Sequence, residues 1–170
     1  MVARLAPEKN IPLALKVIQK VAAKYPRTGL VIIGDGPLLS SLRLTAKSLQ
    51  LEAYVVFAGA QSDVSSLYKT ADAFLVTSLY EGYGLALVEA SAAGLPIVTT
   101  DVGVAREVVR DGESGFVCPV GDSACLSEKI LAVFGEWKGG ERTRGEFRLP
   151  VGVARTEAEY LERFKNSILI

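Results

Sequence analysis

Residues 77–100 read TSLYEGYGLALVEASAAGLPIVTT, and this stretch predicts the fold of the chain. It follows an apolar run at residues 73–76 that is typical of a buried parallel strand. A loop with Gly82 and Gly84 comes next, and a helical pattern starts directly after it. Unpaired backbone N–H groups and the positive end of the helix dipole then lie where the strand ends. The stretch therefore predicts an anion site, most often one for phosphate.

The predicted helix is short and has clear ends. We expect Leu85, Val88 and Ala92 to form its apolar face, and Gly94 to end it. A proline and a second apolar strand, beginning at residues 97–98, follow within a few positions. Strand, helix and strand in this order indicate a parallel α/β unit.

Two carboxylates flank the same helix start. Glu81 lies in the loop, and Glu89 lies in the second helical turn, where side chains lean back toward the N-terminus. We therefore expect both to converge on the loop. Carboxylates repel phosphate but accept hydrogen bonds from sugar hydroxyls, so the combination favours a nucleotide-sugar. On the pattern alone, two solvated helix-end charges are an equally good interpretation.

Composition restricts the function classes. The chain has 170 residues, 49% of them hydrophobic, and it carries 19 basic and 19 acidic residues, so its net charge is zero. That balance gives no overall basic field for nucleic acid. No apolar run approaches the ~20 residues of a membrane span. We expect a cytoplasmic protein with no partner nucleic acid.

Metal and nucleophile chemistry has little support in the sequence. The chain contains no histidine, which excludes His-based triads and His metal sites within it. Cys118 and Cys125 lack metal-ligand spacing, and we expect them to be reduced thiols. No D-x-D motif is present. We therefore expect no metal and no cofactor.

The remaining chain extends the same alternation. Further strands are predicted at residues 30–33, 55–57 and 116–117, and residues 2–5 are typical of the last part of another. We expect a doubly wound, mainly parallel Rossmann-like α/β domain of roughly six strands over residues 1–135. Residues 136–150 indicate an irregular loop. Residues 151–170 are expected to hold a helix on the same domain, with its apolar side formed by Ala158, Leu161, Phe164 and Ile168.

The block around the two glutamates resembles a known family. Seven residues separate Glu81 from Glu89, Gly82-Tyr83-Gly84 follows the first, and Gly-Leu-Pro-Ile-Val ends the helix. This is similar to the E-x7-E element of retaining GT-B glycosyltransferases, of the family 4 or "glycosyl transferases group 1" type. The resemblance covers roughly residues 4–134. It implies the C-terminal, donor-binding half of such an enzyme, and an acceptor-binding N-terminal domain that this chain lacks.

The resemblance also implies site residues. Arg4 and Lys9 would neutralise the donor diphosphate, although Ala3 stands where the family usually has glycine. Glu81 is the candidate catalytic residue and would orient the donor sugar, while Glu89 would bind the ribose. The other expected donor contacts are Gly34, Gly36, Ala60, Gln61, Gly82, Tyr83, Gly84 and Leu85.

The implied reaction is transfer of a sugar from a UDP- or GDP-linked donor to an acceptor hydroxyl, with retention and without metal. This chain alone is expected to be inactive, and peripheral membrane contact would go through the absent domain. Two alternatives stay open. One is half of a sugar-nucleotide epimerase, and the other is a non-enzymatic domain that binds nucleotide-sugars.

Overall fold

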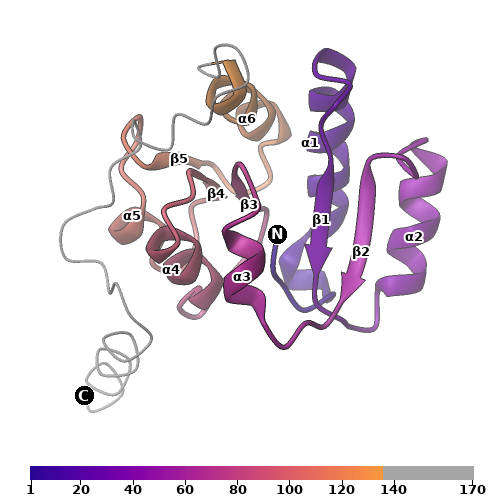
Figure 1. Ribbon diagram of the computed structural model, residues 1–170, viewed down its shortest axis with the longest axis horizontal. Helices are drawn as coiled ribbons and strands as arrows, with labels where there is room; N and C mark the ends of the chain where they lie inside the picture. Colours follow the sequence, from indigo (N-terminus) through magenta and orange to yellow (C-terminus); the bar gives the residue numbers. More distant parts are fainter. Residues whose placement is uncertain (136–170) are drawn as a thin grey trace.

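The computed structural model describes residues 1–135 as parallel strands with helices on both sides (Figure 1). The irregular loop expected at residues 136–150 and the helix expected within residues 151–170 lie outside the described residues. Within residues 1–135, no helix combines the length and apolar character needed to cross a membrane.

Strands and helices alternate along the described chain, close to the predicted positions. The strands are β1 Leu30–Ile33, β2 Val55–Gly59, β3 Phe74–Val76, β4 Ile97–Thr100 and β5 Gly115–Cys118. The helices are η1 Pro7–Lys9, a 3-10 turn, and α1 Ile11–Lys24, α2 Leu39–Ser48, α3 Val64–Tyr68, α4 Leu85–Ala92, α5 Ala105–Val108 and α6 Ser123–Gly135. Helix α4 ends as expected, because Gly94 adopts a left-handed φ of 74° just after its C-cap.

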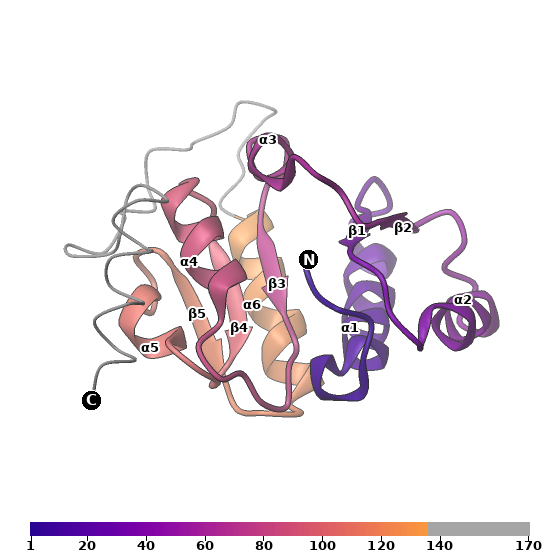
Figure 2. The ribbon, with the colours of Figure 1, turned by 90° about the horizontal axis from the view of Figure 1, so that it is seen from below.

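All strand pairs among the described residues are parallel. Strands β1 and β2 form one pair, and β3, β4 and β5 form a three-stranded unit. The N-terminal segment is extended along β1: Ala3 N donates to Ile33 O at 2.9 Å, and Ile33 N donates to Met1 O at 3.0 Å. Both views place the N-terminus between β1 and β3 (Figures 1 and 2). The strand remnant expected at residues 2–5 thus pairs with β1 on the side that faces β3.

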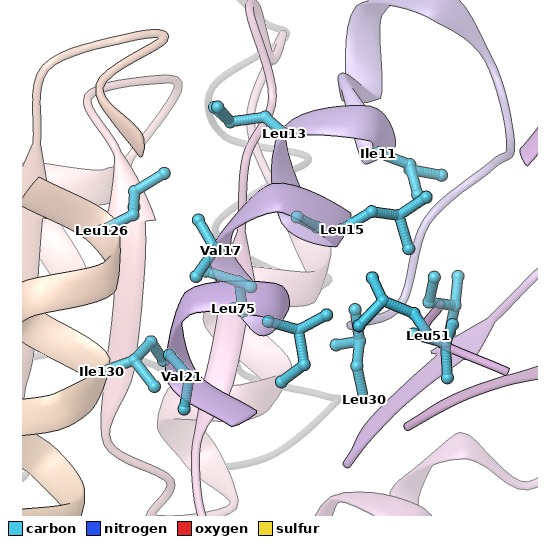
Figure 3. Close-up of a cluster of buried hydrophobic side chains, with 14 of the residues drawn as sticks. Ile11, Leu13, Leu15, Val17, Val21, Leu30, Leu51, Leu75, Leu126 and Ile130 are labelled. Atoms are coloured by element: carbon cyan, nitrogen blue, oxygen red, sulfur yellow. The ribbon is translucent and has the colours of Figure 1, made fainter. Parts of the chain in front are cut away.

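Successive side chains of the central strands enter different cores. Leu75 of β3 packs in a cluster with α1, α2 and α6, whereas its neighbours Phe74 and Val76 pack with α4 and α5. Figure 3 shows Leu75 beside Val17 of α1, with Ile130 of α6 close by. Burying an aliphatic side chain of this size contributes roughly 1.5–3 kcal/mol, so helices on both faces stabilise the sheet. The doubly wound, mainly parallel fold predicted from the sequence is confirmed.

The apolar face of α4 differs from the prediction. Leu85 is 46% exposed and Ala92 is exposed, although both were expected to point inward with Val88. The buried positions of α4 are instead Leu87, Val88, Ala90 and Ser91. The helix packs against both β4 and α5. Its buried surface is therefore rotated about the helix axis relative to the predicted apolar face. Leu85 consequently lies at the exposed start of the helix.

The expectation of two reduced thiols is wrong in this structure, because Cys118 and Cys125 form a disulfide. Cys118 ends β5, and a short turn leads directly into α6. Asp122 Oδ1 accepts hydrogen bonds from the amides of Ala124 and Cys125 at 3.0 and 2.9 Å. This cap starts α6 so soon after β5 that the two cysteine Cα atoms lie 5.9 Å apart. Their sequence spacing alone carries no such signal.

Reduction of this disulfide is predicted to destabilise the domain. A cross-link over so short a loop removes chain entropy from the unfolded state and should contribute about 2 kcal/mol. Urea unfolding followed by circular dichroism should give a lower midpoint with a reductant present than without it. The Cys125→Ala variant is the control, and its midpoint should not respond to the reductant. Equal midpoints for the unmodified protein, with free thiols in both buffers, would contradict the prediction.

Candidate functional site

The loop between β3 and α4 presents an open helix start at the carboxyl ends of the strands. Gly84 precedes α4 with a left-handed φ of 98°, and no side chain among residues 1–135 caps the helix. The first amides of a helix have no acceptor within it, so those of Leu85 and Ala86 remain available at the positive end of the dipole. The uncapped helix start predicted from the sequence is therefore present.

Beside this helix start, a lysine and a glutamate form an ion pair. Lys9 Nζ lies 2.7 Å from both carboxylate oxygens of Glu81. The Ser78 hydroxyl donates to Glu81 Oε1, also at 2.7 Å. The side chains of Lys9 and Glu81 are only 19% and 15% exposed, so water screens the pair less than it would on an open surface. The ion pair sets a cation and a hydroxyl-accepting group side by side.

Buried hydroxyl groups attach the loop to the rest of the fold. Thr77 Oγ1 donates to the carbonyl oxygens of Lys9 and Asn10, at 3.1 Å each. Thr100 Oγ1, at the end of β4, donates to Ser78 O at 2.7 Å. Neither threonine was among the predicted site residues. The sequence does hold one indication of them, because Thr77 and Ser78 directly follow the apolar strand. Buried polar groups at such positions need hydrogen-bond partners.

A close contact between two loops also positions Glu81. A Cβ atom on Gly103 would lie 2.2 Å from Tyr83 O and 3.1 Å from Glu81 Cβ. Only glycine allows this approach, and the approach brings Val104 N to within 2.9 Å of Tyr83 O for a hydrogen bond. The β4–α5 loop thus supports the β3–α4 loop from behind. Gly103 was absent from the predicted site.

These groups surround a cavity of about 320 Å³. Its walls are residues 1–3, Lys9, residues 75–78, Glu81 and residues 83–87. Five of the predicted site residues therefore meet at one cavity: Lys9, Glu81, Tyr83, Gly84 and Leu85. Its volume falls at the lower end of the range for small-molecule sites.

The second glutamate of the pattern has a different partner. Tyr68 Oη donates to Glu89 Oε2 at 2.8 Å, and burial, followed by the neighbouring Glu89 carboxylate, raises the pKa of Tyr68. Glu89 does not line the cavity. The two carboxylates expected to converge therefore have separate partners, Glu81 with Lys9 and Ser78, and Glu89 with Tyr68.

The other predicted residues lie outside the cavity lining. A Cβ on Gly34 would lie 2.0 Å from Ala3 O, and one on Gly36 would lie 2.5 Å from Leu5 O. Both glycines therefore allow the N-terminal segment to pack closely, which accounts for them without a ligand. Arg4, Ala60, Gln61 and Gly82 are exposed, and the Gln61 side chain donates to Ala58 O at 2.7 Å. Donor contact by these six residues stays a prediction.

Replacing Gly103 should cost more stability than replacing a glycine with similar backbone geometry. Gly103→Ala places its methyl group against the Tyr83 carbonyl, whereas Gly112, at φ 77°, has no non-neighbouring atom of the described residues within 4 Å of its Cβ position. Urea unfolding should show Gly103→Ala to be about 1–3 kcal/mol less stable than Gly112→Ala, the usual cost of overpacking. Equal stabilities would show that the two loops are not in close contact in solution.

The family match and the similar relatives agree with one another. The sequence matches the Glycosyl transferases group 1 family over residues 1–144. It is 32% identical over 155 residues to N-acetyl-alpha-D-glucosaminyl L-malate synthase of Bacillus anthracis, covering 86% of this chain and 39% of that protein. It is 32% identical over 130 residues to phosphatidyl-myo-inositol mannosyltransferase of Mycobacterium leprae, covering 75% and 34%. The chain thus spans little more than a third of the length of these relatives.

Solved structures give the same result. The pneumococcal O-GlcNAc transferase GtfA, in complex with UDP and GlcNAc, superimposes with a TM-score of 0.81 at 28% identity, over 98% of this chain and 34% of that one. Anabaena Alr3699/HepE, in complex with UDP, gives a TM-score of 0.71 at 28% identity, over 79% and 38%. The family match, the relatives and these structures agree with the parallel α/β architecture described above. The chain belongs to the Glycosyl transferases group 1 family and has the fold of a GT-B glycosyltransferase domain.

Proposed function

We propose that this chain is the donor-binding part of a retaining glycosyltransferase. The whole enzyme would transfer a sugar from a UDP- or GDP-linked donor to an acceptor hydroxyl. The observation that supports the proposal is that one cavity is lined by groups for two parts of a nucleotide-sugar. The uncapped helix start and Lys9 can bind phosphate, and Glu81 can accept hydrogen bonds from sugar hydroxyls. UDP in the structures of GtfA and HepE supports a nucleotide-bound donor.

The leaving diphosphate would be stabilised by electrostatics. In the proposed complex, the Leu85 amide and Gly84 backbone hold the diphosphate, and Lys9 supplies a positive charge at the cavity wall. Arg4, which is exposed close to the N-terminal strand segment, adds a second. Preorganised donors of this kind act most strongly where charge develops during bond cleavage. Because these groups match the diphosphate charge, we propose that the reaction needs no metal ion.

The two glutamates would orient the sugar parts of the donor. Glu81 would accept hydrogen bonds from the transferred hexose and hold it for attack on the same face, which retention requires. Glu89, on the next turns of α4, would accept hydrogen bonds from the ribose diol. In the structure both carboxylate oxygens of Glu81 accept hydrogen bonds from Lys9. Donor binding would therefore redirect Lys9 toward the phosphates and release one Glu81 oxygen for a hydroxyl.

The acceptor site would lie on another part of the whole protein. The chain spans little more than a third of its relatives, and its cavity lies at the open carboxyl edge of the strands. We propose that an acceptor-binding domain closes over this edge, excludes water and brings the acceptor to the donor. We also propose a cytoplasmic location, with membrane contact, if any, made through that domain.

A binding panel tests the proposal. Calorimetry of the chain with UDP, GDP and their sugar conjugates, each with and without EDTA, should show binding of at least one nucleoside diphosphate that EDTA leaves unchanged. Binding restored only by Mg²⁺ would contradict the metal-free proposal. Absence of binding to every compound would contradict donor binding itself. Turnover of a nucleotide-sugar without an acceptor would favour the epimerase alternative.

Loss of the Lys9 charge should weaken nucleotide binding. Lys9→Met keeps the aliphatic stem but removes the cation, and it leaves the Glu81 carboxylate unpaired beside the phosphates. Affinity for the bound nucleoside diphosphate should fall roughly 10- to 100-fold, the range for a lost charge-assisted hydrogen bond. Lys16→Met, at an exposed position of α1, is the matched control. Equal affinities in the two variants would remove Lys9 from the phosphate site.

A further inference from the structure

A contact between α3 and α4 involves a residue that the proposed mechanism does not use. Tyr68, the last residue of α3, is 5% exposed, and its hydroxyl donates to Glu89 Oε2 at 2.8 Å. Glu89 itself is an exposed residue on α4. An exposed glutamate is normally free to sample many rotamers. Here one of its oxygens is held from a neighbouring helix.

The tyrosine ring that provides this hydrogen bond is itself fixed. It packs edge-on against Phe74, with ring centroids 5.5 Å apart and an interplanar angle of 68°. Phe74 belongs to β3 and is 2% exposed, so the ring rests on the central sheet. The hydroxyl position is therefore set by the core. Glu89 is in turn held at a defined place relative to β3 and to the start of α4.

The phenol of Tyr68 is the hydrogen-bond donor in this contact. Burial, and then the neighbouring Glu89 carboxylate, raise the pKa of Tyr68, so the phenol keeps its proton and acts as the donor. The Glu89 carboxylate accepts through Oε2, and among residues 1–135 its other oxygen, Oε1, accepts no side-chain hydrogen bond. As far as residues 1–135 go, that oxygen is open to a ligand that offers hydroxyl groups.

We propose that Tyr68 is a positioning residue for the donor nucleotide, holding Glu89 so that its free carboxylate oxygen receives the ribose diol. The inference rests on the proposed function, because it needs Glu89 to contact ribose. In the competing interpretation Glu89 only satisfies a buried phenol, and the pair has no effect on ligands. Ribose selectivity separates these two interpretations, since a purely structural contact would not change it.

The experiment compares two nucleotides in two tyrosine variants. UDP and 2′,3′-dideoxy-UDP differ only in the ribose diol, so their affinity ratio measures diol recognition. If GDP is the nucleotide bound, the guanosine pair replaces them. Tyr68→Phe removes the hydroxyl and keeps the ring on Phe74. Tyr25→Phe is the matched control, because Tyr25 also packs edge-on against a phenylalanine, Phe134, at 6.1 Å. Calorimetry measures all four combinations and the unmodified protein.

The unmodified protein and Tyr25→Phe should bind UDP more tightly than the dideoxy analogue. In Tyr68→Phe the UDP affinity should fall about three- to tenfold, the effect of losing one modest hydrogen bond, while the affinity for the analogue stays the same. Adding Glu89→Gln to Tyr68→Phe should then change little further. Equal losses for both nucleotides, or no loss, would overturn the role of Tyr68 and leave the proposed function intact. If the unmodified protein binds UDP but does not distinguish it from the analogue, the ribose role of Glu89 fails, and the inference fails with it.

Discussion

The ion pair between Lys9 and Glu81 connects the two parts of the chain that form the cavity. Lys9 follows the N-terminal segment that lies along β1, and Glu81 belongs to the loop that leads from β3 into α4. Both side chains line the cavity beside the uncapped start of α4. The Thr77 hydroxyl adds a bifurcated hydrogen bond across the same junction, shared between Lys9 O and Asn10 O. The shape of the cavity therefore depends on this contact between distant segments of sequence.

A partly buried ion pair of this kind is a weak source of stability but a suitable one for binding. Desolvation of both charges offsets much of their attraction. The Ser78 hydroxyl bond and the residual exposure of both side chains limit that cost. Replacement of the Glu81 contact by a phosphate contact would then require little net free energy. In the proposed complex the same lysine would exchange its contact with Glu81 for one with the diphosphate.

Local chemistry made much of this domain predictable. Apolar runs located the strands, Gly94 marked the end of α4, and Gly84 marked its start, because each of these features depends on neighbouring residues. The partners of Glu81 and Glu89 were not predictable in this way. Lys9 and Tyr68 are distant from them in the sequence. Gly103, in the loop between β4 and α5, packs against the β3–α4 loop that carries Glu81. The Cys118–Cys125 disulfide likewise depends on how soon Asp122 starts α6, which spacing alone does not specify.

The most direct test of the central claim is a titration of the isotopically labelled protein with UDP or GDP, whichever binds, followed by amide NMR. If the start of α4 holds the diphosphate, the largest shifts will occur at the amides of Gly84, Leu85 and Ala86. The corresponding nucleoside, which lacks phosphate, will not reproduce them, and Val56, on the exposed face of β2, will not shift. Saturable binding whose largest shifts lie away from these three amides would contradict the account.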